Sequence, residues 1–275
     1  MEAHNGISAK IVEEVGFSAI WASGLSISAS YGVRDCNEAS WTQVVETVEF
    51  MADATTIPIL LDADTGFGDY NNVRRLIQKL NKLEIQGICI EDKTFPKKNS
   101  FWKGVYQELA PIDEFCGKIK AAKDSQRSEE FCLIARTEAF VAGFGVEEAL
   151  ERAESYVDSG ADGILVHSKE SSPRQILEFM KHWKKRAPII IVPTTYGTTP
   201  SSVFEKAGVS VVIWANHNLR ASIDAMQTIS KKIYQLSSIA ETEKEIASLK
   251  EVFRLTNTEE LKIADKLYNN PKDNE

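Results

Sequence analysis

The stretch that decides the fold is VDSGADGILVHS, residues 157–168, which is one copy of a repeated unit. A helix-like segment ends in a glycine, which suits the left-handed position that closes a helix. The apolar run that follows is typical of a strand buried on both faces, as in a parallel sheet. The same unit occurs as VEEVGFSAIWAS (12–23), LEIQGICIED (83–92) and EKAGVSVVIWAN (205–216).

Further apolar runs predict three more strands, and amphipathic helical patterns lie between the strands. A chain of about seven strands that alternate with helices predicts a parallel α/β sheet. We favour a (β/α)8 TIM barrel over an open doubly wound sheet, because no G-x-G-x-x-G loop follows any strand. The further strands are IPILLDAD (57–64), FCLIARTEA (131–139) and APIIIVPTT (187–195), and the helical patterns cover 71–84, 112–125 and 146–157.

The last part of the chain has a different character. We expect the barrel core over residues 1–216 and a C-terminal helical segment, 217–275, within the same domain. Three helical patterns follow one another there without a strand, over 219–239, 241–256 and 258–268. Such helices cover the end of a barrel or reach a neighbouring subunit. The alternative is an ordinary last barrel helix with a solvated tail.

Composition narrows the class of protein. The 275 residues are 43% hydrophobic with a net charge of −8, which is ordinary for a globular protein. The negative charge argues against nucleic acid or an anionic membrane as a partner. No apolar run reaches the roughly 18 residues of a membrane span, and the polar start MEAHNGISAK has no signal-peptide pattern. The four cysteines lack C-x-x-C spacing, so we expect reduced thiols in a cytoplasmic protein.

Polar side chains stand at nearly every predicted strand end. In a parallel barrel, the functional residues gather at the C-terminal ends of the strands. We therefore expect these side chains to share one mouth. They are Ser23, Gly24, Asp62, Asp64, Glu91, Asp92, Arg136, Glu138, His167, Ser168, Thr194, Thr195, Asn216 and His217.

Three carboxylates suggest a metal site. Asp62 and Asp64 occupy positions i and i+2 of a strand predicted over 58–64, so both should leave it on one face. Together with Glu91 on the adjacent strand they would repel one another unless a cation offset their charge. Oxygen ligands without histidine or cysteine favour Mg²⁺ or Mn²⁺. The alternative role for each aspartate is a helix N-cap.

Other residues at the mouth are suited to binding an anion. Arg136 could grip a carboxylate or a phosphoryl group, and its alternative is a structural ion pair with Glu138. His167 could be either structural or catalytic. The segment WASGLS (21–26) offers a small anion nest formed by Ser23, Gly24 and Leu25.

A cationic loop, EDKTFPKKNSFWKG (91–104), follows the Glu91 strand. Next to the carboxylates, such a loop could be a lid that closes over an anionic substrate. The alternative is a solvated basic loop. Its polar residues are Lys93, Lys97, Lys98, Asn99 and Ser100, around Pro96.

At these residues the sequence resembles the phosphoenolpyruvate mutase branch of the isocitrate lyase superfamily. The resemblance runs through nearly the whole chain. It implies a (β/α)8 barrel whose last helix is exchanged between subunits in a dimer of dimers, with Mg²⁺ near Asp62, Asp64 and Glu91. It is carried by GLSISASYGVRD (24–35), LLDADTGFGD (60–69), EDKTFPKKNS (91–100), ARTEAF (135–140), GADGILVHSK (160–169) and VIWANHNLRAS (212–222).

The resemblance also implies roles for single residues. Asp35 matches the essential aspartate of the family, either as nucleophile or as the residue that orients the phosphoryl group. Because Asp35 lies in a polar loop, we do not expect it to be buried. Lys97 and Asn99 in the lid are further catalytic candidates. The substrate-binding candidates are Trp21, Ser23, Gly24, Leu25, Ser100, Arg136 and His167.

The implied reaction interconverts phosphoenolpyruvate and phosphonopyruvate, which forms a carbon–phosphorus bond and begins phosphonate synthesis. Three alternatives remain: a phosphonopyruvate hydrolase, a carbon–carbon lyase of the isocitrate or 2-methylisocitrate type, and an inactive homologue that acts as a scaffold. The lyase branch carries a cysteine in K-K-C-G-H, whereas this chain has KKNS at residues 97–100. The hydrolase branch has threonine where Asn99 stands.

One departure concerns the first strand. Family members carry further residues before MEAHNG, including most of the first strand. The first strand is therefore expected to be cut short here, which leaves either a truncated sequence or a barrel that is open by one strand.

Overall fold

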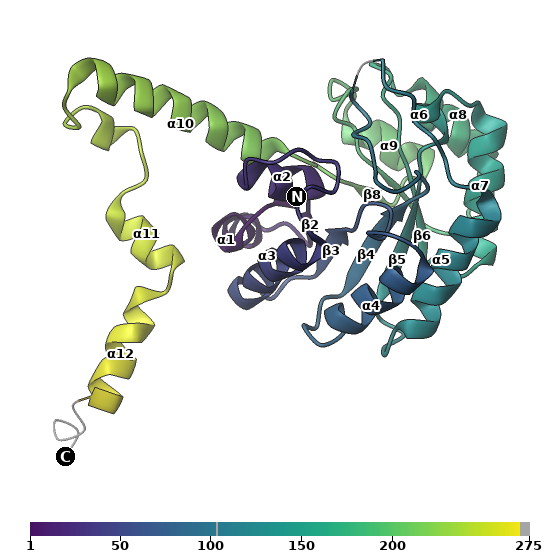
Figure 1. Cartoon of the computed structure of the whole chain (residues 1–275). Coiled ribbons are helices and arrows are strands. Elements are labelled where there is room, and N and C mark those ends of the chain that lie inside the picture. The colour runs from purple at the N-terminus through teal and green to yellow at the C-terminus, as the bar shows by residue number, and fades with distance from the viewer. Residues whose placement is uncertain (103, 270–275) are drawn as a thin grey trace. The chain divides into compact units, whose positions relative to one another are not determined.

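The computed structural model describes residues 1–102 and 104–269. The chain forms two compact units, Met1–His217 and Asn218–Glu275. In the first unit, eight parallel strands follow one another in chain order, and helices cover the outside of the sheet (Figure 1). The predicted α/β barrel architecture is confirmed. The strands are β1 (Glu2–Ala3), β2 (Ile20–Ala22), β3 (Ile59–Asp62), β4 (Gly87–Glu91), β5 (Cys132–Thr137), β6 (Gly163–Val166), β7 (Ile189–Ile191) and β8 (Val211–Val212).

The first strand is short, as expected, and it still takes part in the sheet. Glu2 pairs with Trp21 of β2 in parallel register. On its other side the Glu2 N–H donates to the Trp214 carbonyl oxygen, 2.9 Å away, just beyond β8. One backbone hydrogen bond therefore joins the first strand to the chain that leaves the last one, so the expected gap of one strand is not found.

The helices predicted over 71–84, 112–125 and 146–157 are confirmed as α4, α5 and α7. The first of them ends earlier than predicted, at Leu80. Asp69 begins α4 as its N-cap, because its side chain accepts hydrogen bonds from two backbone N–H groups of the first turn. The barrel helices are α1 (Gly6–Val15), α2 (Gly24–Ser30), α3 (Trp41–Ala54), α4 (Tyr70–Leu80), α5 (Ile112–Ser125), α6 (Ala139–Ala142), α7 (Val146–Asp158), α8 (Arg174–His182) and α9 (Ser201–Ala207).

The glycines of the repeated unit have two different functions. Gly16 and Gly208 end α1 and α9 with φ values of 98° and 93°, in the left-handed region that was predicted. Gly87 instead begins β4 with no positive φ. A Cβ atom on it would lie 2.6 Å from the Cys132 carbonyl oxygen, so glycine is needed there for close approach of two strands.

Strand residues alternate between two apolar clusters. One cluster lies between the sheet and the helices and includes Leu61 of β3 and Ile88 of β4. The alternate side chains of the strands form a smaller cluster, which we place inside the barrel. Two of its members, Trp21 and Val192, also line the cavity described below. The smaller cluster consists of Trp21, Cys89, Ile134, Leu165, Ile190, Val192 and Ile213.

The strand predicted over 58–64 is wrong at its end. β3 stops at Asp62, and Asp64 has φ 51° in the left-handed region. A turn begins there, in which the Gly66 N–H donates to the Ala63 carbonyl oxygen at 2.8 Å. Alternation along a strand therefore does not determine how the two aspartates lie relative to each other.

The second unit is helical. α10 (His217–Leu236) confirms the first predicted helix, and α12 (Thr258–Asn269) confirms the third. The helix predicted over 241–256 is wrong in part, because the chain forms a 3-10 turn at Thr242–Lys244 before α11 (Leu249–Leu255). The Ser248 hydroxyl caps α11 and so sets its start. None of the helices described has the length and apolar character to cross a membrane.

Candidate active site

A cavity of about 50 Å³ opens at the C-terminal ends of the strands. It brings together most of the proposed catalytic, substrate-binding and metal-binding residues. Sequence reasoning named Lys93 only as a residue of the lid, and it missed Phe101, Val192 and Ala215. The strand-end residues that were expected at the mouth but do not line the cavity are Gly24, Asp64, Asp92, Glu138, Ser168, Thr195 and His217. The lining consists of Trp21, Ser23, Leu25, Asp35, Asp62, Glu91, Lys93, Lys97, Asn99, Ser100, Phe101, Arg136, His167, Val192, Thr194, Ala215 and Asn216.

One end of the cavity is acidic. The carboxylates of Asp62 and Asp64 approach each other beside Gly24: a Cβ atom on that glycine would lie 3.3 Å from Asp62 Oδ2 and 3.0 Å from Asp64 Oδ1. The Gly24 N–H donates to Asp62 Oδ2 at 3.3 Å. The Gly24 amide is part of the anion nest predicted at this segment, and it already donates to a carboxylate of the protein itself. Ser23 serves as the N-cap of α2.

The lid reaches this acidic end through Lys97. Its ammonium lies 2.8 Å from Asp35 Oδ1 and also pairs with Asp64 Oδ1. The lysine is 5% exposed and Asp35 is 8% exposed. The expectation that Asp35 would not be buried is wrong, because the lid closes over the loop that carries it.

Asn99 is the second lid residue that contacts Asp35. Its Nδ2 donates to Asp35 Oδ2 at 2.6 Å. Burial raises the pKa of Asp35, but the Lys97 ammonium and these hydrogen bonds lower it by more, so Asp35 is a carboxylate at neutral pH. The lid is also tied down by Asn37, which sequence reasoning missed: its Oδ1 accepts from the Lys97 N–H and its Nδ2 donates to Asp64 Oδ2.

The acidic end holds more negative charge than its neighbours offset. Burial, together with the carboxylates of Asp62, Asp35 and Glu91, raises the pKa of Asp64 to about 7, although Lys97 acts to lower it. Burial also raises the pKa of Asp62. Buried carboxylates that repel one another, with neither thiol nor imidazole among the donors, fit a hard divalent cation.

The third predicted metal ligand, Glu91, has other partners. Its Oε1 lies 3.3 Å from Lys93 Nζ and its Oε2 lies 3.3 Å from Arg136 Nε. Within residues 1–102 and 104–269, no group of three or more His, Cys, Asp and Glu side chains is arranged to hold a metal ion. Metal binding by Asp62, Asp64 and Glu91 therefore stays a prediction.

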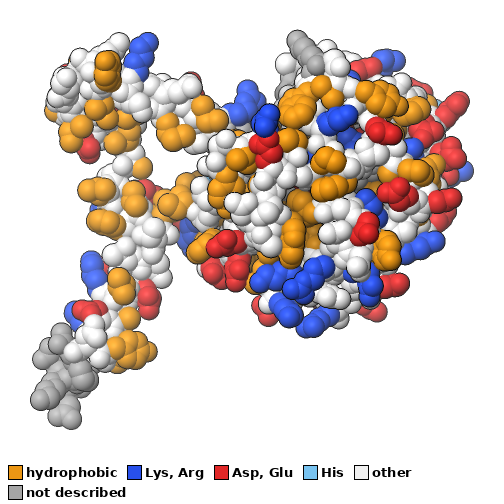
Figure 2. Space-filling view, in the orientation of Figure 1, with side chains coloured by type: hydrophobic (Ala, Val, Ile, Leu, Met, Phe, Trp, Pro, Cys, Tyr) orange, Lys and Arg blue, Asp and Glu red, His pale blue; other side chains and the backbone are white. Residues whose placement is uncertain are grey.

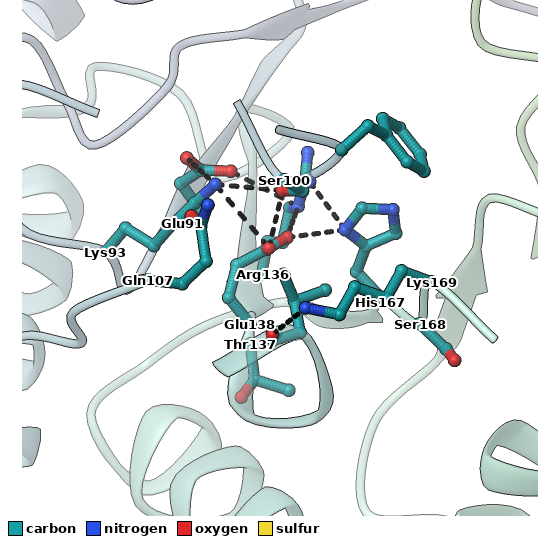
Figure 3. Close-up of polar contacts among 12 residues, drawn as sticks. Glu91, Lys93, Ser100, Gln107, Arg136, Thr137, Glu138, His167, Ser168 and Lys169 are labelled. Carbon is teal, nitrogen blue, oxygen red and sulfur yellow. Dashed lines mark hydrogen bonds and ion pairs between the residues drawn. The ribbon is translucent and has the colours of Figure 1, made fainter. Parts of the chain in front are cut away.

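The other end of the cavity is a charged network around Glu138 (Figure 3). Glu138 is fully buried, and its Oε1 pairs with Arg136 Nε. Its Oε2 accepts from the Ser100 hydroxyl at 2.8 Å, and Lys93 Nζ donates to the same hydroxyl at 2.9 Å. The ion pair that was the alternative role of Arg136 is thus present, and Arg136 nevertheless lines the cavity.

His167 completes this network. Its Nδ1 lies 2.7 Å from Glu138 Oε1. Burial lowers the pKa of His167, so the ring is neutral at pH 7. The neighbouring cations hold the pKa of Glu138 well below its usual range despite burial. Arg136 Nη2 lies 2.8 Å from the same Nδ1. An ionised carboxylate can only accept and a guanidinium can only donate, so these two partners favour opposite tautomers of the neutral ring.

Glu138 is the main residue that sequence reasoning undervalued. The sequence places it at the mouth and as an ion-pair partner of Arg136, yet it binds Arg136, His167 and the lid serine at once. The signal available was its place two residues after Arg136 at a strand exit. Its contact with Ser100 crosses 38 positions in the sequence, which no local pattern reveals.

The chain resembles known proteins in both sequence and fold. The family model described as phosphoenolpyruvate phosphomutase matches residues 1–234. The chain belongs to the phosphoenolpyruvate phosphomutase family. A relative of that name from Tetrahymena pyriformis is 60% identical over 98% of this chain and 89% of its own length.

Two solved structures extend the likeness to the fold. Phosphoenolpyruvate phosphomutase from Streptomyces platensis subsp. rosaceus superimposes with a TM-score of 0.95 at 42% identity, over 97% of this chain and 93% of that one. A phosphonopyruvate hydrolase in complex with oxalate and Mg²⁺ gives a TM-score of 0.91 at 37% identity, over 98% and 93% of the two chains. Mutase and hydrolase thus share one fold with this protein.

Proposed function

We propose that this protein interconverts phosphoenolpyruvate and phosphonopyruvate by moving a phosphoryl group between the oxygen and the carbon of one bound pyruvate enolate. The relatives named as mutases support this reaction. The observation that carries it is the enclosure of Asp35 by Lys97 and Asn99, at hydrogen-bond distances of 2.8 and 2.6 Å. A phosphoryl group next to Asp35 would be covered by the same lid that excludes water.

The two ends of the cavity would hold different parts of the substrate. Arg136 lines one end, where its guanidinium can bind the carboxylate of pyruvate. Asp35 and the lid residues lie at the end that would receive the phosphoryl group. Asp35 acts there either as nucleophile or as the group that orients the phosphoryl oxygens.

Asp62, Asp64 and Glu91 would hold Mg²⁺, or Mn²⁺ in its place. These buried oxygen donors offer what a hard cation requires. When bound, the metal supplies positive charge that stabilises the enolate oxygen. The solved structure of a phosphonopyruvate hydrolase in complex with oxalate and Mg²⁺ supports a metal at the corresponding site of this protein.

Asn99 distinguishes phosphoryl transfer from hydrolysis. Its amide can donate a hydrogen bond to phosphoryl oxygens, but it neither takes nor gives a proton at neutral pH. It would therefore hold the migrating group without activating a water molecule. Lys97 would add positive charge to the closed lid.

Asn99→Ala is expected to lower kcat by about 10²-fold or more, since a donor used in the transition state is lost. Because the lid then admits water, part of the flux should appear as pyruvate and phosphate. Lys98→Ala is the matched control: its side chain is exposed next to Asn99, and only its carbonyl oxygen binds Lys93. An equal loss of rate in both variants would argue against the role of Asn99.

The reaction itself is tested by ³¹P NMR of the purified protein with phosphonopyruvate and Mg²⁺. Phosphonate, phosphate ester and free phosphate give separate signals. We expect the phosphonate signal to be replaced by that of phosphoenolpyruvate. Free phosphate alone would identify a hydrolase, and no change would favour an inactive homologue.

We also infer that the chain assembles with copies of itself, as a dimer of dimers with exchanged C-terminal helices. Exposed apolar side chains gather along the helices after the barrel (Figure 2). In α11, Leu249, Val252 and Phe253 are exposed at i, i+3 and i+4, which places them on one face of the helix. Such a face in water is typical of an interface.

The mass in solution tests this inference. Light scattering is expected to give a multiple of the chain mass, with four copies predicted. Phe253→Glu should lower that mass, whereas Lys250→Glu, which adds the same residue to another face of α11, should not. A single-chain mass for the unmutated protein would contradict self-association.

We place the enzyme in the cytoplasm. All four cysteines are free in the described structure, which fits a reducing compartment.

A further inference from the structure

Asp92 follows the predicted metal ligand Glu91 but belongs to a different set of contacts. It is fully buried. Its carboxylate binds residues of the outer helix α7: Tyr156 Oη donates to Asp92 Oδ2 at 2.7 Å and Arg152 Nη1 lies 3.3 Å from the same oxygen. The reaction proposed above uses none of these three side chains.

Asp92 also connects three segments of the mouth through backbone groups. Its N–H donates to the Arg136 carbonyl oxygen at 3.1 Å, and its carbonyl oxygen accepts from the Ala110 N–H at 2.8 Å, where the lid returns to the barrel. Its Oδ1 accepts from the Glu138 N–H at 2.8 Å. One residue thus fixes the exits of two strands and the end of the lid.

Helix α7 holds this arrangement from outside. Arg152 Nη1 donates to the Ala110 carbonyl oxygen at 3.0 Å and contacts Tyr156 Oη at 3.1 Å. The guanidinium therefore binds both Asp92 and the end of the lid, whereas the phenol binds Asp92 and the guanidinium. A buried carboxylate with these partners has few ways to move, so its position is well defined.

The contact with Glu138 makes Asp92 important for the site. The Glu138 carboxylate binds Arg136, His167 and Ser100, as Figure 3 shows. A shift of the Glu138 backbone would move all three groups together. We propose that Asp92, held by Tyr156 and Arg152, is a positioning residue that sets the anion-binding end of the site and the end of the lid. This inference rests on the proposed function, because it assigns substrate binding to that end.

Tyr156→Phe is the sharpest test, because it removes one hydroxyl from the Asp92 carboxylate. The phenyl ring keeps its edge contact with Phe115, whose centroid lies 4.7 Å away. Tyr196→Phe is the matched control. Tyr196 is 1% exposed, and its hydroxyl has no hydrogen-bond partner in the described structure, so the same atom is deleted from a buried ring without touching Asp92.

The first readout needs no substrate. The ¹⁵N signals of the His167 ring, assigned with His167→Gln, report the contacts of Nδ1 with Glu138 and Arg136. We expect these signals to shift in Tyr156→Phe and to stay in place in Tyr196→Phe. His167 signals in Tyr156→Phe that coincide with those of the unmutated protein would overturn the proposal.

The second readout separates positioning from general stability. With phosphonopyruvate and Mg²⁺, kcat/KM of Tyr156→Phe is expected to fall about tenfold, because the anion-binding groups are misplaced. Tyr196→Phe should keep nearly all of its kcat/KM, and the two variants should have equal melting temperatures. Equal losses in the two variants would overturn the proposal. If the unmutated protein does not form phosphoenolpyruvate, the proposed function fails, while the His167 signals still decide the positioning role.

Discussion

Asp35→Ala is expected to lower phosphoryl transfer by at least about 10³-fold, because the residue that we propose contacts the phosphoryl group is removed. Both Lys97 and Asn99 of the lid contact the Asp35 carboxylate. Its loss leaves a gap where the phosphoryl group would be oriented or attacked. The rate is measured under saturating phosphonopyruvate and Mg²⁺.

The effect on stability should be moderate. Asp35 is buried, so its removal leaves the Asn99 amide without its acceptor, at a cost of about 1–3 kcal/mol. Lys97 keeps its ion pair with Asp64. We therefore expect a lower melting temperature in a protein that still folds. Glu38→Ala is the control, since Glu38 belongs to the same loop but pairs with Arg34 outside the cavity. Retained turnover in Asp35→Ala would contradict the assignment.

Asp62→Ala is expected to abolish most Mg²⁺ binding and to lower turnover by about 10²-fold or more, since one of the three predicted metal ligands is lost. Among the described residues, the only hydrogen bond to the Asp62 side chain is the 3.3 Å one from the Gly24 N–H, so the fold should tolerate the change. Titration calorimetry with Mg²⁺ measures the binding, and Glu38→Ala again serves as the control.

The requirement for a metal can also be tested with the unmutated protein. A chelator should remove activity and added Mg²⁺ or Mn²⁺ should restore it. Full activity in excess chelator, or unchanged Mg²⁺ affinity in Asp62→Ala, would show that these carboxylates do not hold a required metal.

Much of the fold could be predicted because each unit of the barrel carries its own local signals. Amphipathic helices, the apolar strands and the glycines that end α1 and α9 are all visible within a short window of sequence. The prediction failed at Asp64, where the chain leaves the strand for a left-handed turn. Glycines at 66 and 68 signal a turn, but they do not indicate where the strand ends.

The sequence predicted which residues belong to the candidate site better than it predicted the contacts among them. Strand order alone places Asp62, Glu91, Arg136 and His167 at one mouth. The burial of Asp35 depends on Asn99, 64 positions away, and on the path of the lid. Partners at such a separation follow from packing of the whole barrel, so neither the closed lid nor the position of Asp92 could be read from the sequence.

The most direct test of phosphoryl transfer within one closed site is the reaction of phosphonopyruvate in ¹⁸O-water, followed by ³¹P NMR. A phosphoryl group that never meets water gains no ¹⁸O, whereas hydrolysis places one water oxygen in the phosphate and shifts its signal. Our account predicts phosphoenolpyruvate in which the three non-bridging phosphoryl oxygens carry no ¹⁸O. The bridging oxygen comes from the keto group, which exchanges with water before the reaction and is scored separately. Phosphate that carries ¹⁸O, formed without phosphoenolpyruvate, would contradict it.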